Sequence, residues 1–177
     1  MAQKYEVGTV MITEQEIAKR AEEIGKLITE EFAGQEVLAI GILKGAAIWL
    51  ADVIRNIDLD VKIDFMAVSS YGAGTKSSGA VKIIKDLDDP IEGKNVIIIE
   101  DIVDSGITLN YLKNYLLSME PKTLKICTFL DKPTGRQIDI DIDYTGFVVP
   151  DKFIVGYGLD YAQQYRNLPY VTCLTSD

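Results

Sequence analysis

The first hydrophobic pattern in the chain predicts an amphipathic helix. Thr13 and Glu16 have the spacing of a capping box, in which each side chain accepts a hydrogen bond from the backbone of the other. Apolar residues then recur at the period of a helix with one buried face: Ile17, Ala21, Ile24 and Ile28. Gly34 is a typical stop signal, so we expect the helix to end before it.

Farther along the chain, apolar runs of strand length alternate with helical patterns. We expect helices at 45–57 and 108–119. We expect strands at 37–42, 61–69, 80–87, 95–99, 124–130, 144–149, 153–155 and 170–174. This alternation predicts an α/β fold with a central, mainly parallel sheet flanked by helices on both faces.

One pair of predicted strands is joined by an unusual connection. Residues 71–79 are rich in Gly and Ser and lie between the strands at 61–69 and 80–87. We therefore expect a long hairpin, or flap, with a mobile tip.

Length and composition restrict the class of protein. The 177 residues are 47% hydrophobic, which fits a single domain over 1–177. No apolar run approaches the roughly 20 residues that span a bilayer, and the N-terminus shows no export signal, so we expect a cytoplasmic protein. Cys127 and Cys173 lie in apolar runs and are expected to be reduced core thiols.

The charge narrows the range of partners. With 18 basic and 27 acidic residues the net charge is −9, which disfavours binding to nucleic acid and to anionic membranes. An anionic small molecule would need local help from magnesium, backbone amides or a few placed cations. Because the chain has no histidine, any acid or base must be another residue.

Three predicted loops follow the carboxyl ends of strands, where α/β sheets bind their ligands. They are residues 43–45, 100–108 and 131–136. We expect the binding site to be built from these loops.

The run from Val96 to Thr108 carries the most chemical information. A buried strand leads to adjacent carboxylates, Glu100 and Asp101, which can accept from a diol or from metal-bound water. A small-residue turn follows, in which amides and hydroxyls can form an anion nest at a helix N-terminus. The residues of this predicted phosphate nest are Ser105, Gly106 and Thr108.

Asp104 lies between the carboxylates and the nest and is the best candidate for a catalytic base. Taken singly, each of these acids could instead cap a helix or form a turn. The complete run is better explained by binding of a sugar phosphate.

This run resembles the phosphoribosyl pyrophosphate signature of type I phosphoribosyltransferases. Further motifs resemble, in order, the hypoxanthine-guanine branch: Leu43-Lys44-Gly45, Ser70-Tyr71, Asp131-Lys132-Pro133, and Phe153 to Tyr161 followed by Arg166. The resemblance covers nearly the whole chain. Ser105 stands where threonine is common, and its hydroxyl preserves the donor.

The resemblance implies roles for residues on the sugar side. Lys44 and Gly45, after a cis peptide bond between Leu43 and Lys44, would contact pyrophosphate, as would Arg166. Glu100 and Asp101 would bind the ribose and a magnesium ion, and Asp160 would ligate a second magnesium. Ser70 and Tyr71 would belong to the flap that closes over the reaction and excludes water.

It also implies roles on the purine side. Lys132 would donate to the 6-oxo group, which adenine lacks. Phe153 would stack on the base, Ile154 would offer backbone groups to its other edge, and Asp160 would lie near the same edge. A small hood over the base site completes the fold that the family implies.

The implied activity is purine salvage, with Mg²⁺ as cofactor and phosphoribosyl pyrophosphate and a 6-oxopurine as substrates. The family also implies a homodimer or homotetramer. An alternative is a nucleotide-sensing regulator that keeps this fold and binds RNA, although the net charge of −9 argues against it. A Walker loop at 72–77 is rejected, because no glycine directly precedes Lys76 and no strand-to-helix context surrounds it.

Overall fold

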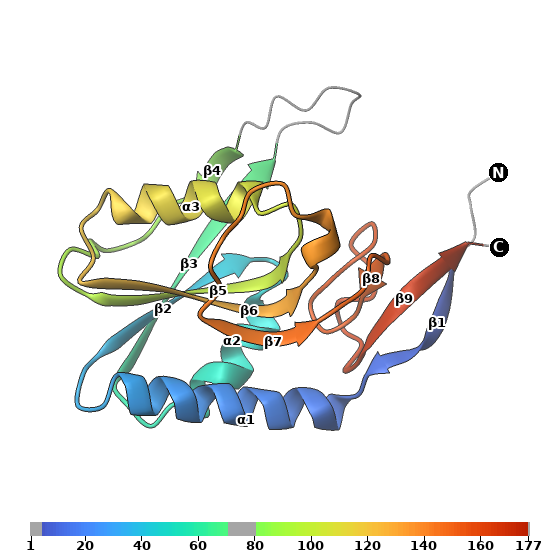
Figure 1. Cartoon of the computed structure of the whole chain (residues 1–177), viewed down its shortest axis with the longest axis horizontal. Coiled ribbons are helices and arrows are strands. Elements are labelled where there is room, and N and C mark those ends of the chain that lie inside the picture. Colours follow the sequence, from blue (N-terminus) through green and yellow to red (C-terminus); the bar gives the residue numbers. More distant parts are fainter. Residues whose placement is uncertain (1–4, 71–80, 177) are drawn as a thin grey trace.

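The computed structural model describes residues 5–70 and 81–176 and contains two sheets. The larger has six strands in the order β4-β3-β2-β5-β6-β7, and every neighbouring pair is parallel except β3 and β4 (Figure 1). Its strands are β2 (Val37–Leu43), β3 (Val61–Ser70), β4 (Val81–Lys85), β5 (Asn95–Val103), β6 (Thr123–Asp131) and β7 (Tyr144–Val148). The predicted mainly parallel sheet is confirmed.

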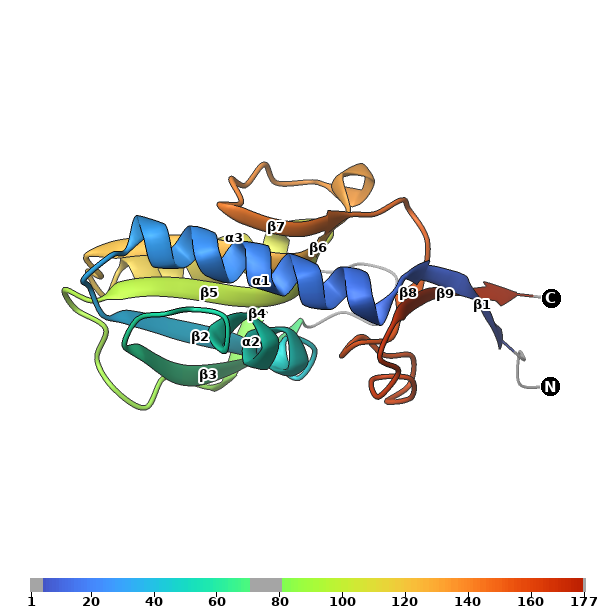
Figure 2. The ribbon, with the colours of Figure 1, turned by 90° about the horizontal axis from the view of Figure 1, so that it is seen from below.

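Helices cover both faces of this sheet. The helices α1 (Glu14–Glu31) and α2 (Ala47–Ile54) lie on one face, and α3 (Ile107–Leu117) lies on the other (Figures 1 and 2). In β5, Ile97 and Ile99 belong to the core beneath α1 and α2, whereas Val96 and Ile98 belong to the core beneath α3. The continuous apolar run in the sequence therefore reflects a strand that is buried on both faces.

The predicted N-terminal helix is confirmed, together with its capping box. The Thr13 side chain accepts from the Glu16 amide at 3.2 Å, and Glu16 accepts from the Thr13 amide at 2.8 Å. The helix predicted at 45–57 is shorter than expected at both ends, because residues 45 and 46 form a turn before α2 and the helix ends at Ile54.

A smaller antiparallel sheet, in the order β1-β9-β8, lies beyond the carboxyl edge of the larger one (Figure 1). It contains β1 (Tyr5–Ile12), β8 (Ile154–Val155) and β9 (Val171–Ser176). Sequence patterns alone did not predict β1, whose Val7 and Val10 are exposed. This strand forms because it pairs with β9 at the other end of the chain. This sheet corresponds to the hood that the resemblance implied.

One predicted strand needs correction, and part of the predicted flap lies outside the described residues. The strand predicted at 95–99 continues to Val103, since its ladder with β6 includes Glu100 and Ile102, so Glu100 and Asp101 lie within the strand. The antiparallel pairing of β3 with β4 confirms the hairpin, but Tyr71, the side chain of Ser70 and the predicted mobile tip lie outside the described residues. In the described residues, no helix is long and apolar enough to cross a membrane.

Candidate active site

The carboxyl ends of three adjacent strands, β2, β5 and β6, bring the three predicted loops together. The Leu43–Lys44 peptide bond after β2 is cis, as the resemblance implied. A Cβ atom at Gly45 would lie 1.6 Å from Asp101 Oδ2, and one at Gly158 would lie 2.2 Å from the Gly45 carbonyl oxygen. Only glycine permits this close contact between the loop after β2, the acidic strand β5 and the segment after β8.

The two adjacent carboxylates are held by local hydrogen bonds. Glu100 Oε1 accepts from the Asp101 amide at 3.0 Å, and Asp101 Oδ1 accepts from the Ile102 amide at 2.7 Å. Burial, together with the neighbouring charge of Asp101, raises the pKa of Glu100 well above its ordinary value. Burial also raises the pKa of Asp101, although the nearby Arg166 cation opposes the shift. A buried carboxylate next to a partly buried one attracts a cation or a sugar diol.

The predicted phosphate nest borders a cavity of about 120 Å³ that is lined by Glu100, Asp104, Ser105, Gly106 and Thr108, among others. Gly106 has a left-handed backbone, with φ of 81°, and caps the N-terminus of α3. A Cβ atom there would also lie 2.6 Å from the carbonyl oxygen of Ile138, so a side chain has no room. The helix N-terminus and the small residues thus form a pocket suited to an anion.

Asp104 is paired with Lys132. Lys132 Nζ lies 2.8 Å from Asp104 Oδ2 and 3.4 Å from Asp151 Oδ1. The hydrogen bond from Lys132 to Asp104 raises the pKa of the lysine, so its ammonium is charged at neutral pH. The side chain of Asp104 is 48% exposed, which leaves it free to contact a ligand.

A second cationic group lies across the site. Arg166 Nη2 pairs with Asp160 Oδ1 at 2.8 Å, and Arg166 Nη1 donates to the Gly158 carbonyl at 2.6 Å. Arg166 Nε is buried and has no partner among the described residues. Gln163 Oε1 lies 3.4 Å from both Lys44 Nζ and Arg166 Nη2, so these two cations are close to the same oxygen atom. This arrangement of two cations favours the binding of a polyanion.

The remaining predicted purine residues lie at the start of the hood. Phe153 precedes β8 rather than belonging to it, is 54% exposed, and meets the ring of Tyr161 edge to face at 5.6 Å. Ile154 is buried and pairs with Cys173 of β9. An exposed aromatic ring such as that of Phe153 offers a flat apolar surface to a base.

The described residues contain no cluster of three side chains from His, Cys, Asp and Glu that could hold a metal ion. Glu100 and Asp101 are therefore not joined by Asp160 in one cluster of that kind. Magnesium commonly keeps several waters and uses one or two carboxylates together with substrate phosphates. The carboxylates present fit that mode of binding.

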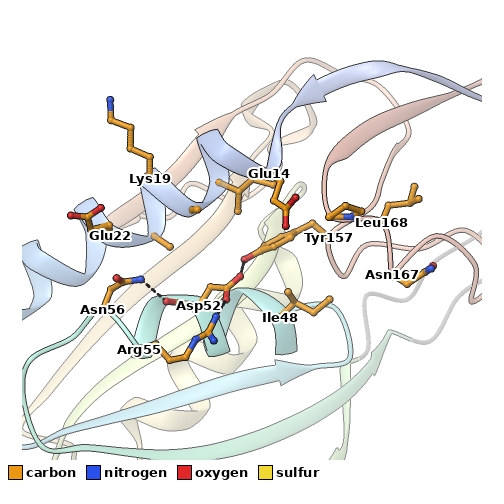
Figure 3. Close-up of a pocket in the computed structure, with 14 residues that line it drawn as sticks. Glu14, Lys19, Glu22, Ile48, Asp52, Arg55, Asn56, Tyr157, Asn167 and Leu168 are labelled. Carbon is orange, nitrogen blue, oxygen red and sulfur yellow. Dashed lines mark hydrogen bonds and ion pairs between the residues drawn. The ribbon is translucent and has the colours of Figure 1, made fainter.

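Sequence reasoning missed residues that support the site. Tyr157, which follows β8, donates its hydroxyl proton to Asp52 of α2 (Figure 3). The Tyr157 ring packs against Trp49 and Phe129. Burial, with the Asp52 carboxylate, raises the pKa of Tyr157. The motif from Phe153 to Tyr161 includes Tyr157. The motif could not identify Asp52 as its partner, because Asp52 is remote in sequence.

Cavity size alone would have indicated a different place. A cavity of about 730 Å³ lies between α1, α2 and residues 157–169 (Figure 3). None of the predicted site residues lines it. The chemistry of the side chains, rather than volume, therefore identifies the active site.

The fold and this site together define a phosphoribosyltransferase. A family model described as the phosphoribosyl transferase domain matches residues 9–162. The chain belongs to that family.

Similar proteins narrow the assignment to the hypoxanthine-guanine branch. The chain is 54% identical over 171 residues to the hypoxanthine-guanine phosphoribosyltransferase of Bacillus subtilis, covering 97% of this chain and 95% of that protein. A crystal structure of a Bacillus anthracis hypoxanthine-guanine phosphoribosyltransferase matches with a TM-score of 0.91 and 44% identity, over 97% of this chain and all of that one. A Trypanosoma cruzi hypoxanthine phosphoribosyl transferase matches with a TM-score of 0.90 and 36% identity, over 98% and 94% of the two chains. These relatives support the transferase and give no support to the RNA-binding regulator.

Proposed function

We propose that this site performs purine salvage by transferring the 5-phosphoribosyl group of phosphoribosyl pyrophosphate to N9 of hypoxanthine or guanine. The products are IMP or GMP and pyrophosphate. The observation that carries the proposal is the Lys132–Asp104 pair, with 2.8 Å between Nζ and Oδ2, at the edge of the phosphate nest. It offers a donor and an acceptor side by side.

The purine edge of a 6-oxopurine complements this pair. Its O6 accepts a hydrogen bond, which Lys132 donates, and its neighbouring N7–H donates to the Asp104 carboxylate. Adenine carries an amino group at position 6, which cannot accept a hydrogen bond from the Lys132 ammonium, so the pair discriminates against adenine. Phe153 stacks on the ring, while Ile154 and the Asp160 region face its other edge.

The sugar phosphate lies along β5 and the start of α3. The 5-phosphate occupies the nest of Ser105, Gly106 and Thr108, where amides and hydroxyls replace its water shell. Glu100 and Asp101 accept from the ribose hydroxyls or from the water shell of a magnesium ion. These contacts fix the anomeric carbon near Asp104.

The leaving pyrophosphate faces the opposite side of the ribose. Lys44, the Gly45 backbone and Arg166 bind it, and the planar guanidinium suits its oxygens. Arg166 Nε, which has no partner within 5–70 and 81–176, supports this role, because a buried donor without an acceptor is costly until a ligand supplies one.

Magnesium would be held by Glu100 and Asp101 on the ribose side and by Asp160 on the pyrophosphate side. When bound, it would neutralise charge that develops on the leaving group. Asp160 is 25% exposed in its pair with Arg166, so it stays within reach of solvent and ligand.

Transfer forms the bond from N9 to C1 and breaks the bond from C1 to the pyrophosphate oxygen. The electron pair of the broken bond leaves with pyrophosphate. Asp104 takes the N7 proton of the purine as the bond from N9 to C1 forms. Lys44 and Arg166 stabilise the negative charge on the leaving group. Residues 70 and 71 would exclude water from the activated sugar.

Pyrophosphate release tests the function directly. Phosphoribosyl pyrophosphate and magnesium would be mixed with hypoxanthine, guanine, adenine or uracil, or with no base. We expect fast release with hypoxanthine and guanine alone, and loss of release when a chelator removes magnesium. Release without a base, or with every base, would contradict the purine assignment.

The expected assembly rests on the family resemblance. We propose a cytoplasmic homodimer or homotetramer that acts on small molecules and binds neither nucleic acid nor membrane. Sedimentation of the purified protein at several concentrations would distinguish these assemblies from a monomer.

A further inference from the structure

The three carbonyl groups of residues 103–105 all point to one neighbouring segment, residues 132–138. The Val103 carbonyl accepts from the Lys132 amide at 2.9 Å and from Arg136 Nη2 at 3.4 Å. The Asp104 carbonyl accepts from Arg136 Nε at 3.0 Å. The Ser105 carbonyl accepts from the amides of Gln137 and Ile138 at 2.9 and 3.0 Å.

These bonds orient the other side of the same peptide units. In a trans peptide the carbonyl and the N–H point in opposite directions. Anchoring the carbonyls of 103–105 therefore turns the N–H groups of Ser105 and Gly106 away from the 132–138 segment. In residues 5–70 and 81–176 neither N–H has an acceptor, so both are available to an anion.

Arg136 is built into this arrangement. Its guanidinium pairs with Asp131, and the two side chains are only 16% and 18% exposed. The pairing holds the planar fork so that Nε and Nη2 reach two successive carbonyls. A Cβ atom at Gly106 would lie 3.2 Å from Arg136 Cδ, so the arginine stem also packs against the nest.

We propose that Arg136, held by Asp131, is a positioning residue that sets the phosphate nest for the 5-phosphate of the sugar substrate. It touches no substrate; it acts through the backbone of Val103 and Asp104. The proposal rests on the proposed function for the identity of the anion. It adds the reason why the nest amides are oriented before the ligand arrives.

The same segment carries Lys132, whose amide and ammonium contact Val103 and Asp104 respectively. Arg136 therefore also fixes the backbone of the catalytic base. Disturbing it should weaken the phosphate contact first and slow turnover second, while pyrophosphate contacts at Lys44 and Arg166 remain.

The test compares Arg136→Gln and Arg136→Lys with Arg20→Gln. Arg20 is a matched control, since its guanidinium also donates to two successive carbonyls, those of Thr145 and Gly146, and pairs with a carboxylate, that of Glu23, away from the site. The readouts are kcat, the KM values for phosphoribosyl pyrophosphate and for hypoxanthine, and the inhibition constants of ribose 5-phosphate and of magnesium pyrophosphate. Denaturation with urea reports stability.

For Arg136→Gln we expect roughly tenfold weaker inhibition by ribose 5-phosphate and a similar rise in the KM for phosphoribosyl pyrophosphate. Inhibition by magnesium pyrophosphate should change less than about twofold. Lysine should restore part of the loss, because it can reach one carbonyl but cannot span two. Arg20→Gln should lose stability and keep all of these constants.

Asp131→Asn provides a second variant if Arg136→Gln does not fold. It leaves the guanidinium in place but removes its charged anchor, and the same constants should shift in the same direction. The proposal is overturned if these variants lose stability while ribose 5-phosphate inhibits them as it inhibits the unmodified protein. If the unmodified protein binds ribose 5-phosphate but releases no pyrophosphate with any base, the proposed function fails. The positioning role can then still be measured from the dissociation constant of ribose 5-phosphate in each variant.

Discussion

Lys132 Nζ and Asp104 Oδ2 lie 2.8 Å apart, although the two residues follow different strands of the sheet. The pair places a charged donor beside a carboxylate acceptor on the exposed side of the loop after β5. In the proposed complex, Lys132 donates a hydrogen bond to O6 of the purine, and the Asp104 carboxylate accepts one from N7–H.

Replacing Asp104 should separate chemistry from binding. We expect Asp104→Ala to reduce kcat by on the order of a hundredfold or more, the usual range for a general acid or base, while the KM for phosphoribosyl pyrophosphate stays within a few-fold. Steady-state kinetics with saturating hypoxanthine measure both. The matched control is Asp89→Ala, an exposed acid in another loop. Unchanged turnover in Asp104→Ala would remove this residue as the base.

Replacing Lys132 should affect the purine rather than the sugar. We expect Lys132→Ala to raise the KM for hypoxanthine and guanine by roughly tenfold or more, because O6 loses a charged donor. Discrimination against adenine should fall in the same variant. Lys62→Ala, which removes only a surface pair with Glu36, is the control. An equal loss with every base would contradict the specificity role.

A methyl group at position 45 should disrupt the contact between two loops. The added Cβ of Gly45→Ala would lie 1.6 Å from Asp101 Oδ2, so the carboxylate or the loop must move. We expect kcat/KM for phosphoribosyl pyrophosphate to fall by roughly ten- to a hundredfold. Gly34→Ala is the control: its φ of 73° makes alanine unfavourable by about 1 kcal/mol, but no atom lies within 4 Å. Comparable loss of activity in both variants would point to general destabilisation.

The stability of the fold at low pH should depend on Asp64 of β3, which pairs with Lys85 of β4. Burial acts to raise the pKa of Asp64, but hydrogen bonds from the Asp88 and Phe65 amides and the charge of Lys85 outweigh it and leave the pKa below its ordinary value. A carboxylate with a lowered pKa in the folded state contributes stability above its unfolded pKa, and this is lost as pH falls through the folded value. Asp64→Asn should therefore cost about 1–3 kcal/mol at pH 7.

Urea denaturation at several pH values tests this. The difference in unfolding free energy between the two proteins should shrink as pH falls below about 4, near the unfolded pKa of aspartate. Replacing Asp58, an exposed acid, with asparagine gives the control curve. A difference that stays constant with pH would show that the asparagine merely packs poorly.

Parts of the fold were predictable because local pattern and tertiary environment agree. The capping box at Thr13 begins α1, and the β-branched run before Glu100 forms a central strand. Predictions failed where partners remote in sequence decide the structure. The β1 strand forms because it pairs with β9, and β5 continues through its two acids because β6 continues beside it.

The sequence by itself determined the family, the mainly parallel sheet and the residue types of the site, because apolar period and motif spacing are local properties of the chain. Only the tertiary structure decided which groups meet: Lys132 with Asp104, Gly45 with Asp101, Tyr157 with Asp52, and Arg136 with the carbonyls of the nest. Each of these contacts joins residues that are remote in sequence, and their distances depend on how strands and helices pack. Local sequence patterns cannot specify such distances, since the same loop could adopt several conformations until its neighbours fix one.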